Sequence, residues 1–273
     1  MEQKYSGAGN TFIMVNNLDD HIADRRERVL ELISVEGEGM DGVIFLEKSE
    51  IADFKMNYFN RDGSGDALCG NGLRCTARFA ADNNITESDR ISIEAVSEIY
   101  EAQLLSDGKV KVKFPSPRRL KTNFKLKVHF EGWWEMLNCS YVDVGSPHIL
   151  VFIDEIEKPK IASIEEVNVI EWGRNIRMHK DLMPEGANVN FVQVEDAGNG
   201  KLLIRSYERG VEGETLACGT GAMSAAIVFY ALRESANPVT LKTRSGEVLI
   251  VELEFDGNRL TAVQMTGNAT RIE

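Results

Sequence analysis

The sequence has few of the features that place a protein in a membrane or outside the cell. Its 273 residues contain no run of eighteen apolar residues, which excludes a membrane-spanning helix of the usual length. Its first residues, MEQKYSGAGN, are polar and lack the apolar core of a secretion signal. We therefore expect a cytoplasmic protein, in which the four cysteines are free thiols and form no disulfide framework.

The sequence also lacks the usual motifs of metal sites and the positive charge typical of nucleic-acid-binding proteins. The cysteines form no C-x-x-C pair, and no histidine belongs to an H-E-x-x-H pattern, so we expect no metal site. The net charge of −12 repels phosphate backbones and argues against a nucleic-acid partner. Hydrophobic residues make up 43% of the chain, which is enough for a substantial core. A globular protein that binds a small molecule fits these features.

Two halves of the chain share one pattern. The motif C-G-x-G, followed by a helix-like run, occurs at 69–72 and again at 218–221, an interval of 149 residues. Asp-Gly turns between alternating apolar strands follow each motif, at 107–108 and 256–257, with the same interval. The pattern predicts two copies of one domain, each with short strands, a helix that begins at C-G-x-G, and a closing hairpin.

The similarity extends upstream of both motifs. Residues 9–15, GNTFIMV, parallel residues 145–151, GSPHILV. Residues 41–46, DGVIFL, parallel residues 187–192, ANVNFV. Each half therefore begins with strands that precede its C-G-x-G helix.

The two halves meet near a pair of prolines. Pro115 and Pro117 interrupt a strand ladder because proline has no backbone N–H to donate. We expect a first domain of residues 1–117, with the tail 266–273 packing back on it, and a second domain of residues 118–265. Both are of normal domain size.

Each C-G-x-G motif places a thiol at the start of a helix. Glycines in the first turn let the backbone approach a ligand closely. The first N–H groups of a helix have no partner within it and favour an anion. A thiolate is also stabilised there, so the pKa of Cys69 or Cys218 can fall below the usual value of about 8.5. Each motif thus combines an acid–base group with an anion cradle.

Two such motifs suit the inversion of an α-carbon. One thiolate removes the α-proton and the opposing thiol returns a proton to the other face, so the reverse reaction only exchanges their roles. The helix N-termini supply fixed positive potential for the carbanion, which would otherwise need an electron-withdrawing cofactor. The pattern therefore indicates a cofactor-independent amino-acid epimerase with Cys69 and Cys218 as the catalytic pair. Cys75 and Cys139 lie inside a helix-like and a strand-like run, where we expect buried apolar residues.

Segments around both cysteines resemble a known family. FNRDGSGDALCGNGLRCTARF and YERGVEGETLACGTGAMSAA are similar to the two active-site segments of the diaminopimelate epimerases. GAGNTFIMV, VGSPHILVF and GANVNFVQV resemble further segments in the same order, so the resemblance covers nearly the whole chain. It implies an α/β (α+β) fold of two pseudo-symmetric domains, each a curved, mostly antiparallel sheet around a central helix. It also implies a homodimer without cofactor that interconverts L,L- and meso-diaminopimelate for lysine and peptidoglycan precursor synthesis.

The resemblance assigns roles to individual residues. Cys69 and Cys218 match the catalytic cysteines. The residues that match the cradle of the reacting carboxylate are Gly70, Asn71, Gly72, Gly219 and Thr220. Those that match groups near the reacting amino end are Asn10 and Glu208. Those that match the site for the distal amino-acid end are Asn60, Asn188 and Arg209. An arginine suits a distal carboxylate because its planar fork can donate two hydrogen bonds.

The chain departs from the family pattern at a few positions. Gly42 stands where we expect glutamine, and Ser146 stands where we expect asparagine. The segment 211–214 also carries an extra residue. His148, after Pro147, is expected to be structural. These departures leave the cysteine chemistry intact and bear on which substrate is bound.

Three other interpretations are compatible with parts of this pattern. A related racemase could act on another amino acid, such as histidine, or on several, although Asn60, Asn188 and Arg209 favour a substrate with a second amino-acid end. Enzymes of the proline racemase or hydroxyproline epimerase type have histidine where this chain has Asn71. A non-catalytic ligand-binding protein would have lost a thiol, and both are present.

Overall fold

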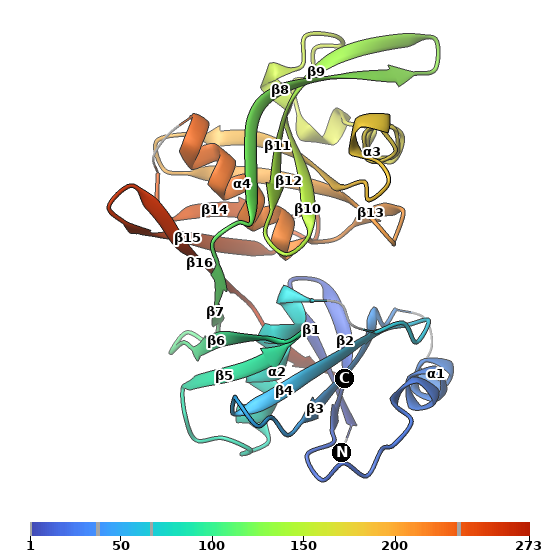
Figure 1. Cartoon of the computed structure of the whole chain (residues 1–273), viewed down its shortest axis with the longest axis vertical. Coiled ribbons are helices and arrows are strands. Elements are labelled where there is room, and N and C mark those ends of the chain that lie inside the picture. Colours follow the sequence, from blue (N-terminus) through green and yellow to red (C-terminus); the bar gives the residue numbers. More distant parts are fainter. Residues whose placement is uncertain (1, 37–38, 66–67, 234–235) are drawn as a thin grey trace. The chain divides into compact units, whose positions relative to one another are not determined.

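The computed structural model describes residues 2–36, 39–65, 68–233 and 236–273 (Figure 1). They form two compact units, Met1–Phe114 with Thr266–Glu273, and Pro115–Met265. Both units combine helices with a mostly antiparallel set of strands, which confirms the expected α/β class. Within the described ranges, no helix has the length and apolar character needed to cross a membrane.

The first unit holds eight strands and two helices in its described part. They are β1 (Glu2–Gly7), β2 (Asn10–Asn16), α1 (Arg25–Glu36), β3 (Gly42–Glu47), β4 (Phe54–Asn60), α2 (Gly70–Asp82), β5 (Arg90–Ala95), β6 (Glu98–Leu104), β7 (Val110–Pro115) and β17 (Thr270–Ile272). Alternating buried positions in β5 to β7 are typical of strands with one face toward a core. β3 is buried along its whole length, so both of its faces are covered.

The core of this unit is built around α2. Its apolar residues Leu73, Cys75, Ala77, Phe79 and Ala80 are all fully buried. The helix contacts β1 to β6 and β17, so strands surround it on most sides (Figure 1). It follows that the first turn of α2, which carries the first cysteine motif, is held on a rigid support.

The second unit has the same kind of elements. Those that the structure describes are β8 (Arg119–Phe130), β9 (Trp133–Asp143), β10 (Pro147–Phe152), α3 (Val169–Arg177), β11 (Asn188–Asp196), β12 (Lys201–Glu208), β13 (Gly213–Thr215), α4 (Gly219–Leu232), β14 (Val239–Lys242), β15 (Val248–Asp256) and β16 (Arg259–Gly267), with single 3₁₀ turns at Ile153–Glu155, Ile164–Glu166 and Lys180–Leu182. α4 contacts β9, β10, β11 and β15. Its sequence is apolar all round, as suits a helix covered on every side.

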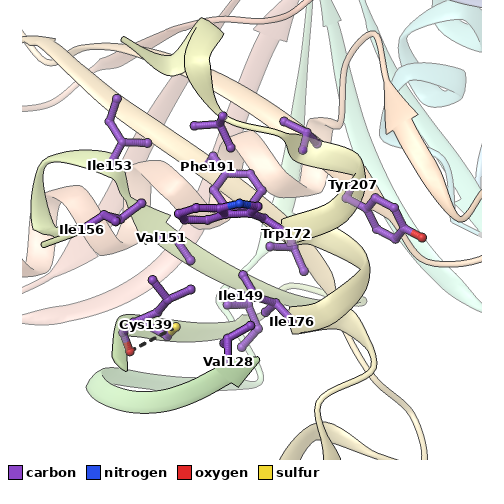
Figure 2. Close-up of a cluster of buried hydrophobic side chains, with 14 of the residues drawn as sticks. Val128, Cys139, Ile149, Val151, Ile153, Ile156, Trp172, Ile176, Phe191 and Tyr207 are labelled. Atoms are coloured by element: carbon purple, nitrogen blue, oxygen red, sulfur yellow. Dashed lines mark hydrogen bonds between the residues drawn. The ribbon is translucent and has the colours of Figure 1, made fainter. Parts of the chain in front are cut away.

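A second helix, α3, closes a separate apolar cluster of this unit. Figure 2 shows the Trp172 ring beside Phe191 at the centre of that cluster, with ring centroids 6.3 Å apart at a T-shaped angle. Ile149 and Ile176 lie in the same cluster. Because β10 and β11 carry Ile149 and Phe191 on one face, this packing fixes the strands whose first residues belong to the candidate site.

The strand pairing confirms the predicted repeat. In the first unit β2 and β3 are parallel, β3 and β4 antiparallel, β4 and β5 parallel, and β5 and β6 antiparallel. In the second unit the pairs β10 and β11, β11 and β12, β12 and β14, and β14 and β15 follow the same order. The parallel ladders also match in register, since Phe12 pairs with Gly42 and His148 pairs with Asn188.

Candidate active site

Cys69 caps the N-terminus of α2. Its backbone is extended, with φ −124° and ψ 105°, and its Sγ accepts a hydrogen bond from the Gly72 N–H at 3.3 Å. A methyl group added at Gly72 would lie 2.9 Å from Ile44 Cδ1, so the helix start rests directly on β3. A larger residue would have to displace the end of the Ile44 side chain, and glycine avoids this. The thiol, half-buried, therefore lies at a helix N-terminus that favours negative charge.

Asn71 is fixed by two polar neighbours. Its Nδ2 donates to Asn10 Oδ1 at 2.6 Å, and its Oδ1 accepts from the guanidinium of the fully buried Arg74 at 2.7 Å. Asn10 thus turns its carbonyl oxygen toward the helix, so its NH₂ group is the end that can donate to a ligand. The structure brings Cys69, Asn71 and Asn10 together, while the side chain of Asn71 is committed to the protein.

Asn60 lies at the same end of the sheet as Asn10. Asn60, on β4, pairs with Gly42 of β3, and Gly42 pairs on its other side with Phe12 of β2. Its Oδ1 accepts a hydrogen bond from the Tyr58 hydroxyl at 2.9 Å, and its Nδ2 donates to Ser64 Oγ at 3.0 Å. Tyr58 therefore sets the direction in which the Asn60 amide points.

Tyr58 also occupies the space that a side chain at position 42 would need. A methyl group at Gly42 would meet the Phe59 carbonyl oxygen and would lie 2.6 Å from the Tyr58 ring. The ring is held in place by edge-to-face packing on Phe12, with centroids 5.8 Å apart. Gly42 and Tyr58 are thus coupled, because the Tyr58 ring fills space that a glutamine side chain at position 42 would need.

We predict that Gly42→Ala destabilises the fold by about 1–3 kcal/mol, because the added methyl group overpacks β3 and β4. Urea unfolding measures the free energy. Gly213→Ala is the matched control, since nothing lies within 4 Å of a methyl group there, and it should change the free energy by less than about 0.5 kcal/mol. Equal effects of both changes would contradict the packing of Tyr58 against Gly42.

Cys218 caps α4 with nearly the same backbone angles as Cys69, φ −121° and ψ 107°. Its side chain is only 6% exposed, and its Sγ is 3.5 Å from Thr220 Oγ1. A methyl group at Gly221 would collide with the Asn190 side-chain amide, so this helix start also rests on a strand. Gly219 is buried in the same turn.

The expected fall in thiol pKa is wrong for Cys218. Burial raises the pKa of this thiol well above its usual value, and the nearby Glu208 carboxylate raises it further. The Thr220 hydroxyl and the Gly221 backbone N–H act in the opposite direction. Cys218 is therefore held as a thiol, because desolvation outweighs the contribution of the helix start.

Glu208, at the end of β12, lies close to the Cys218 thiol. Its Oε1 accepts a short hydrogen bond from the Thr215 hydroxyl, and the influence of its carboxylate on the pKa of Cys218 shows that the two side chains are close. A carboxylate at this place can accept a hydrogen bond from a thiol or from an ammonium group. Its predicted place near the reacting amino end stays a prediction.

Asn188 and Arg209 are joined by a hydrogen bond. The buried Asn188 accepts the Arg209 backbone N–H at 2.8 Å and donates to the Pro147 carbonyl oxygen at 3.2 Å. The Arg209 side chain is exposed, and its Nη1 donates to the Glu185 carbonyl oxygen at 3.2 Å. The chain turns at 209–210 and leaves the guanidinium in solvent.

His148 is fully buried beneath the start of α4. Its Nε2 is 2.9 Å from Ser146 Oγ, and its Nδ1 is 3.0 Å from Asn190 Nδ2. Burial lowers the pKa of His148 to about 3, and the charge of Arg209 adds to this effect. The ring is therefore neutral at physiological pH.

We predict that this neutral histidine makes the fold sensitive to acid. Between about pH 6.5 and pH 3 the unfolded chain protonates His148 while the folded chain does not, so this group removes stability as the pH falls through that window. The slope from one proton is at most about 1.4 kcal/mol per pH unit. Urea unfolding at pH 7, 6, 5 and 4 should show a steeper loss for the wild type than for His148→Asn. Parallel curves would show that burial does not depress this pKa.

The other two cysteines are buried, as predicted. Burial raises the pKa of Cys75 and of Cys139 to about 12, which makes both thiols unreactive near neutral pH. Cys75 packs against Gly7 of β1, where a methyl group would lie 3.0 Å from its Sγ. Cys139 donates a weak hydrogen bond to the Leu137 carbonyl oxygen within the core cluster (Figure 2).

Two residues of this region are not in the sequence-based prediction. Asn190 is fully buried, donates to the Ile149 carbonyl oxygen at 3.2 Å and accepts from the Ser206 hydroxyl at 2.8 Å. It lies two residues after Asn188, and alternation along a strand puts both on one face. Tyr58 precedes Asn60 by two residues for the same reason. Strand alternation was therefore the signal that could have identified both.

Comparison with known proteins decides the family. A family model described as diaminopimelate epimerase matches residues 3–120 and 140–272. The chain belongs to the diaminopimelate epimerase family. It is 38% identical over 265 residues to the diaminopimelate epimerase of Hydrogenobaculum sp., covering 93% of this chain and 91% of that one. The enzyme of Chlorobaculum tepidum is 37% identical over 249 residues, with 90% of both chains covered. Members of the family are isomerases, and this chain is accordingly an isomerase.

Solved structures extend the likeness to the fold. A phenazine biosynthesis protein of the PhzF family from Bacillus anthracis superposes with a TM-score of 0.70 over 100% of this chain and 96% of that one, at 15% sequence identity. At this identity the likeness concerns the fold alone. It confirms the predicted pseudo-symmetric architecture and says nothing about the substrate.

Proposed function

We propose that this chain is a diaminopimelate epimerase that uses Cys69 and Cys218 as its acid–base pair and needs no cofactor. The observation that carries the proposal is the repeated helix start. Each unit places one cysteine as the N-cap of a glycine-containing helix, and the two caps differ by only 2–3° in φ and ψ. Membership of the diaminopimelate epimerase family supplies the substrate class.

The chemistry follows from what a helix start offers. One thiolate takes the α-proton while the C–H electron pair stays on the α-carbon, and the thiol of the other half gives a proton to the opposite face. The mechanism requires that the two sulfurs face one α-carbon from opposite sides. In this proposal the N–H groups of the two first turns, at 70–72 and 219–220, hold the α-carboxylate and stabilise the carbanion.

The remaining polar residues divide between the two ends of the substrate. Asn10 and Glu208 would lie near the reacting amino end, because each lies beside a cysteine helix. Of the two, the Glu208 carboxylate is the group that can accept a hydrogen bond from the ammonium, since the Asn10 carbonyl oxygen already accepts from Asn71. Asn60, Asn188 and Arg209 would bind the distal amino-acid end. Arg209 precedes Cys218 by nine residues and Asn60 precedes Cys69 by nine, so one distal group comes from each half of the repeat.

On the basis of family membership we further propose that the enzyme is a cytoplasmic homodimer that serves lysine and peptidoglycan precursor synthesis. A racemase of other or broader specificity is the second candidate. Gly42 and Ser146 favour it, because they shorten two side chains of the region expected to line the substrate.

The test is α-proton exchange in deuterated water, followed by proton NMR, with L,L-diaminopimelate, histidine, lysine and proline as separate substrates. We expect loss of the α-proton signal and formation of the meso isomer with L,L-diaminopimelate alone. Exchange of histidine or lysine at an equal or higher kcat/KM would replace the diaminopimelate assignment by the racemase. Absence of exchange with all four would reject both.

A further inference from the structure

A continuous row of hydrogen bonds connects the buried His148 with the Cys218 sulfur. The row starts at His148 Nε2, which is 2.9 Å from Ser146 Oγ. Ser146 Oγ donates to Thr220 Oγ1 at 3.3 Å. Thr220 Oγ1 is in turn 3.5 Å from Cys218 Sγ. We call the two hydroxyls in the middle, those of Ser146 and Thr220, the hydroxyl pair.

The direction of these hydrogen bonds is set at the histidine. Asn190 is oriented by the Ser206 hydroxyl, which donates to its Oδ1, and by the Ile149 carbonyl oxygen, which accepts from its Nδ2. Its second Nδ2 hydrogen points at His148 Nδ1, at 3.0 Å. His148 Nδ1 must therefore be the acceptor nitrogen, and the single proton of the neutral ring lies on Nε2.

A hydroxyl carries one hydrogen, so the direction set at Nε2 continues along the row. His148 Nε2–H donates to Ser146, whose hydroxyl then donates to Thr220, and the Thr220 hydroxyl is left to donate to the Cys218 sulfur. Asn188 Nδ2 also lies 3.4 Å from Nε2, but this contact is longer than the 3.0 Å contact of Asn190 Nδ2 with Nδ1, so the Asn190 contact decides which nitrogen carries the proton. Every donor in the row thus points toward the sulfur.

In the first half of the repeat, the described residues at the positions equivalent to His148 and Asn190 cannot form such a row. The strand pairing makes Phe12 the equivalent of His148 and Ile44 the equivalent of Asn190. Both of these first-half residues are apolar and buried. The histidine and the asparagine at the start of the row are therefore specific to the second half.

The equivalent of the hydroxyl pair makes the difference clearer. Asn10 and Asn71 occupy the positions of Ser146 and Thr220 in the first half, and they are joined by an amide hydrogen bond of 2.6 Å. The Asn71 carbonyl oxygen accepts from Arg74, so that contact ends in the protein and not at a sulfur. In the first half, the two residues thus fix the Asn71 side chain. In the second half, the residues at the same positions lead to the Cys218 thiol.

We propose that Ser146 is a positioning residue which, through Thr220, directs a hydrogen bond at Cys218 and thereby stabilises its thiolate. The inference rests on the proposed function, in which Cys218 must give up its proton in one direction of the reaction. Burial and the Glu208 carboxylate both raise the pKa of Cys218. The Thr220 hydroxyl is one of the two groups that lower it. A hydroxyl that already accepts a hydrogen bond is a stronger donor, so each link polarises the next.

Serine is suited to this position because one atom both accepts and donates. Alanine at 146 would end the row, and valine at 220 would keep the shape of threonine without a hydroxyl to donate. Since both changes break one row, their effects on the thiolate should not add.

The experiment measures the thiolate without substrate. In a Cys69→Ala background, the rate constant for alkylation of Cys218 by iodoacetamide at pH 8 is proportional to the thiolate fraction, and mass spectrometry identifies the modified peptide. We expect Ser146→Ala and Thr220→Val each to slow alkylation about tenfold, which corresponds to a rise of about one pKa unit. The double variant should be no slower than either single one. Ser146→Thr, which keeps the hydroxyl, should restore most of the rate.

A matched control uses the first half. In a Cys218→Ala background, Ser146→Ala should leave the alkylation rate of Cys69 unchanged. Alkylation of Cys218 that is unaffected by Ser146→Ala, or additive effects of Ser146→Ala and Thr220→Val, would overturn the proposal. A raised KM with unchanged alkylation would assign Ser146 to substrate binding and also overturn it. Because no substrate is present, failure of the epimerase assay would reject the proposed function and leave this result interpretable.

Discussion

Replacing either Cys69 or Cys218 by alanine is expected to lower the rate of epimerisation by at least about a thousandfold. Positioned acid–base groups contribute about 10²- to 10⁴-fold each, and inversion needs one on each face of the α-carbon. One remaining thiol can still exchange a proton on its own face, but it cannot deliver one to the other. The measurement is the conversion of L,L- to meso-diaminopimelate, followed by chiral chromatography.

Cys75 and Cys139 provide the matched controls for this result. Both are buried and both have a thiol pKa near 12, so neither can act as a base near neutral pH. Cys75→Ala and Cys139→Ala should retain most of the activity and lose only about 1 kcal/mol of stability from the small cavity. Turnover at the wild-type rate by Cys69→Ala or Cys218→Ala would show that the two-thiol mechanism is wrong.

The repeat and the two helix starts could be predicted because their signals are local. A C-G-x-G motif before an apolar run specifies a helix N-terminus within a few residues, and Asp107-Gly108 specifies a hairpin turn whatever surrounds it. The structure places Cys69 and Cys218 as N-caps for that reason. Such features need no knowledge of which segments meet in space.

Properties that depend on the surroundings of a residue were not accessible in the same way. The pKa of Cys218 depends on its burial and on Glu208, which lies ten residues away in the sequence, and the helix start alone predicts the opposite direction. The exposure of Arg209 depends on a turn whose course the sequence does not specify. The filling of the space at Gly42 depends on how the Tyr58 ring lies across β3.

Arg209 is the residue whose replacement should separate diaminopimelate from simpler amino acids. A monofunctional amino acid needs one carboxylate cradle, which the helix starts at Cys69 and Cys218 would provide. Diaminopimelate has a second carboxylate, and an arginine can hold it with two parallel hydrogen bonds. The exposed guanidinium of Arg209 pairs with no carboxylate among the described contacts and donates only to the Glu185 carbonyl oxygen. Its backbone is fixed by Asn188, so the side chain starts from a defined place.

We therefore expect Arg209→Met to lower kcat/KM for L,L-diaminopimelate about 10- to 150-fold, the equivalent of roughly 1.5–3 kcal/mol for hydrogen bonds to a charged group. Because the arginine is exposed, the variant should unfold at the same urea concentration as the wild type. Arg259→Met is the matched control, since it removes an exposed arginine from the start of β16 and should change kcat/KM by less than about twofold. Lysine has no distal carboxylate, so any slow exchange of lysine should be unaffected by Arg209→Met. The variant should therefore discriminate less between L,L-diaminopimelate and lysine. An unchanged kcat/KM for L,L-diaminopimelate would remove Arg209 from the distal site, and with it the main argument for a substrate that has a second amino-acid end.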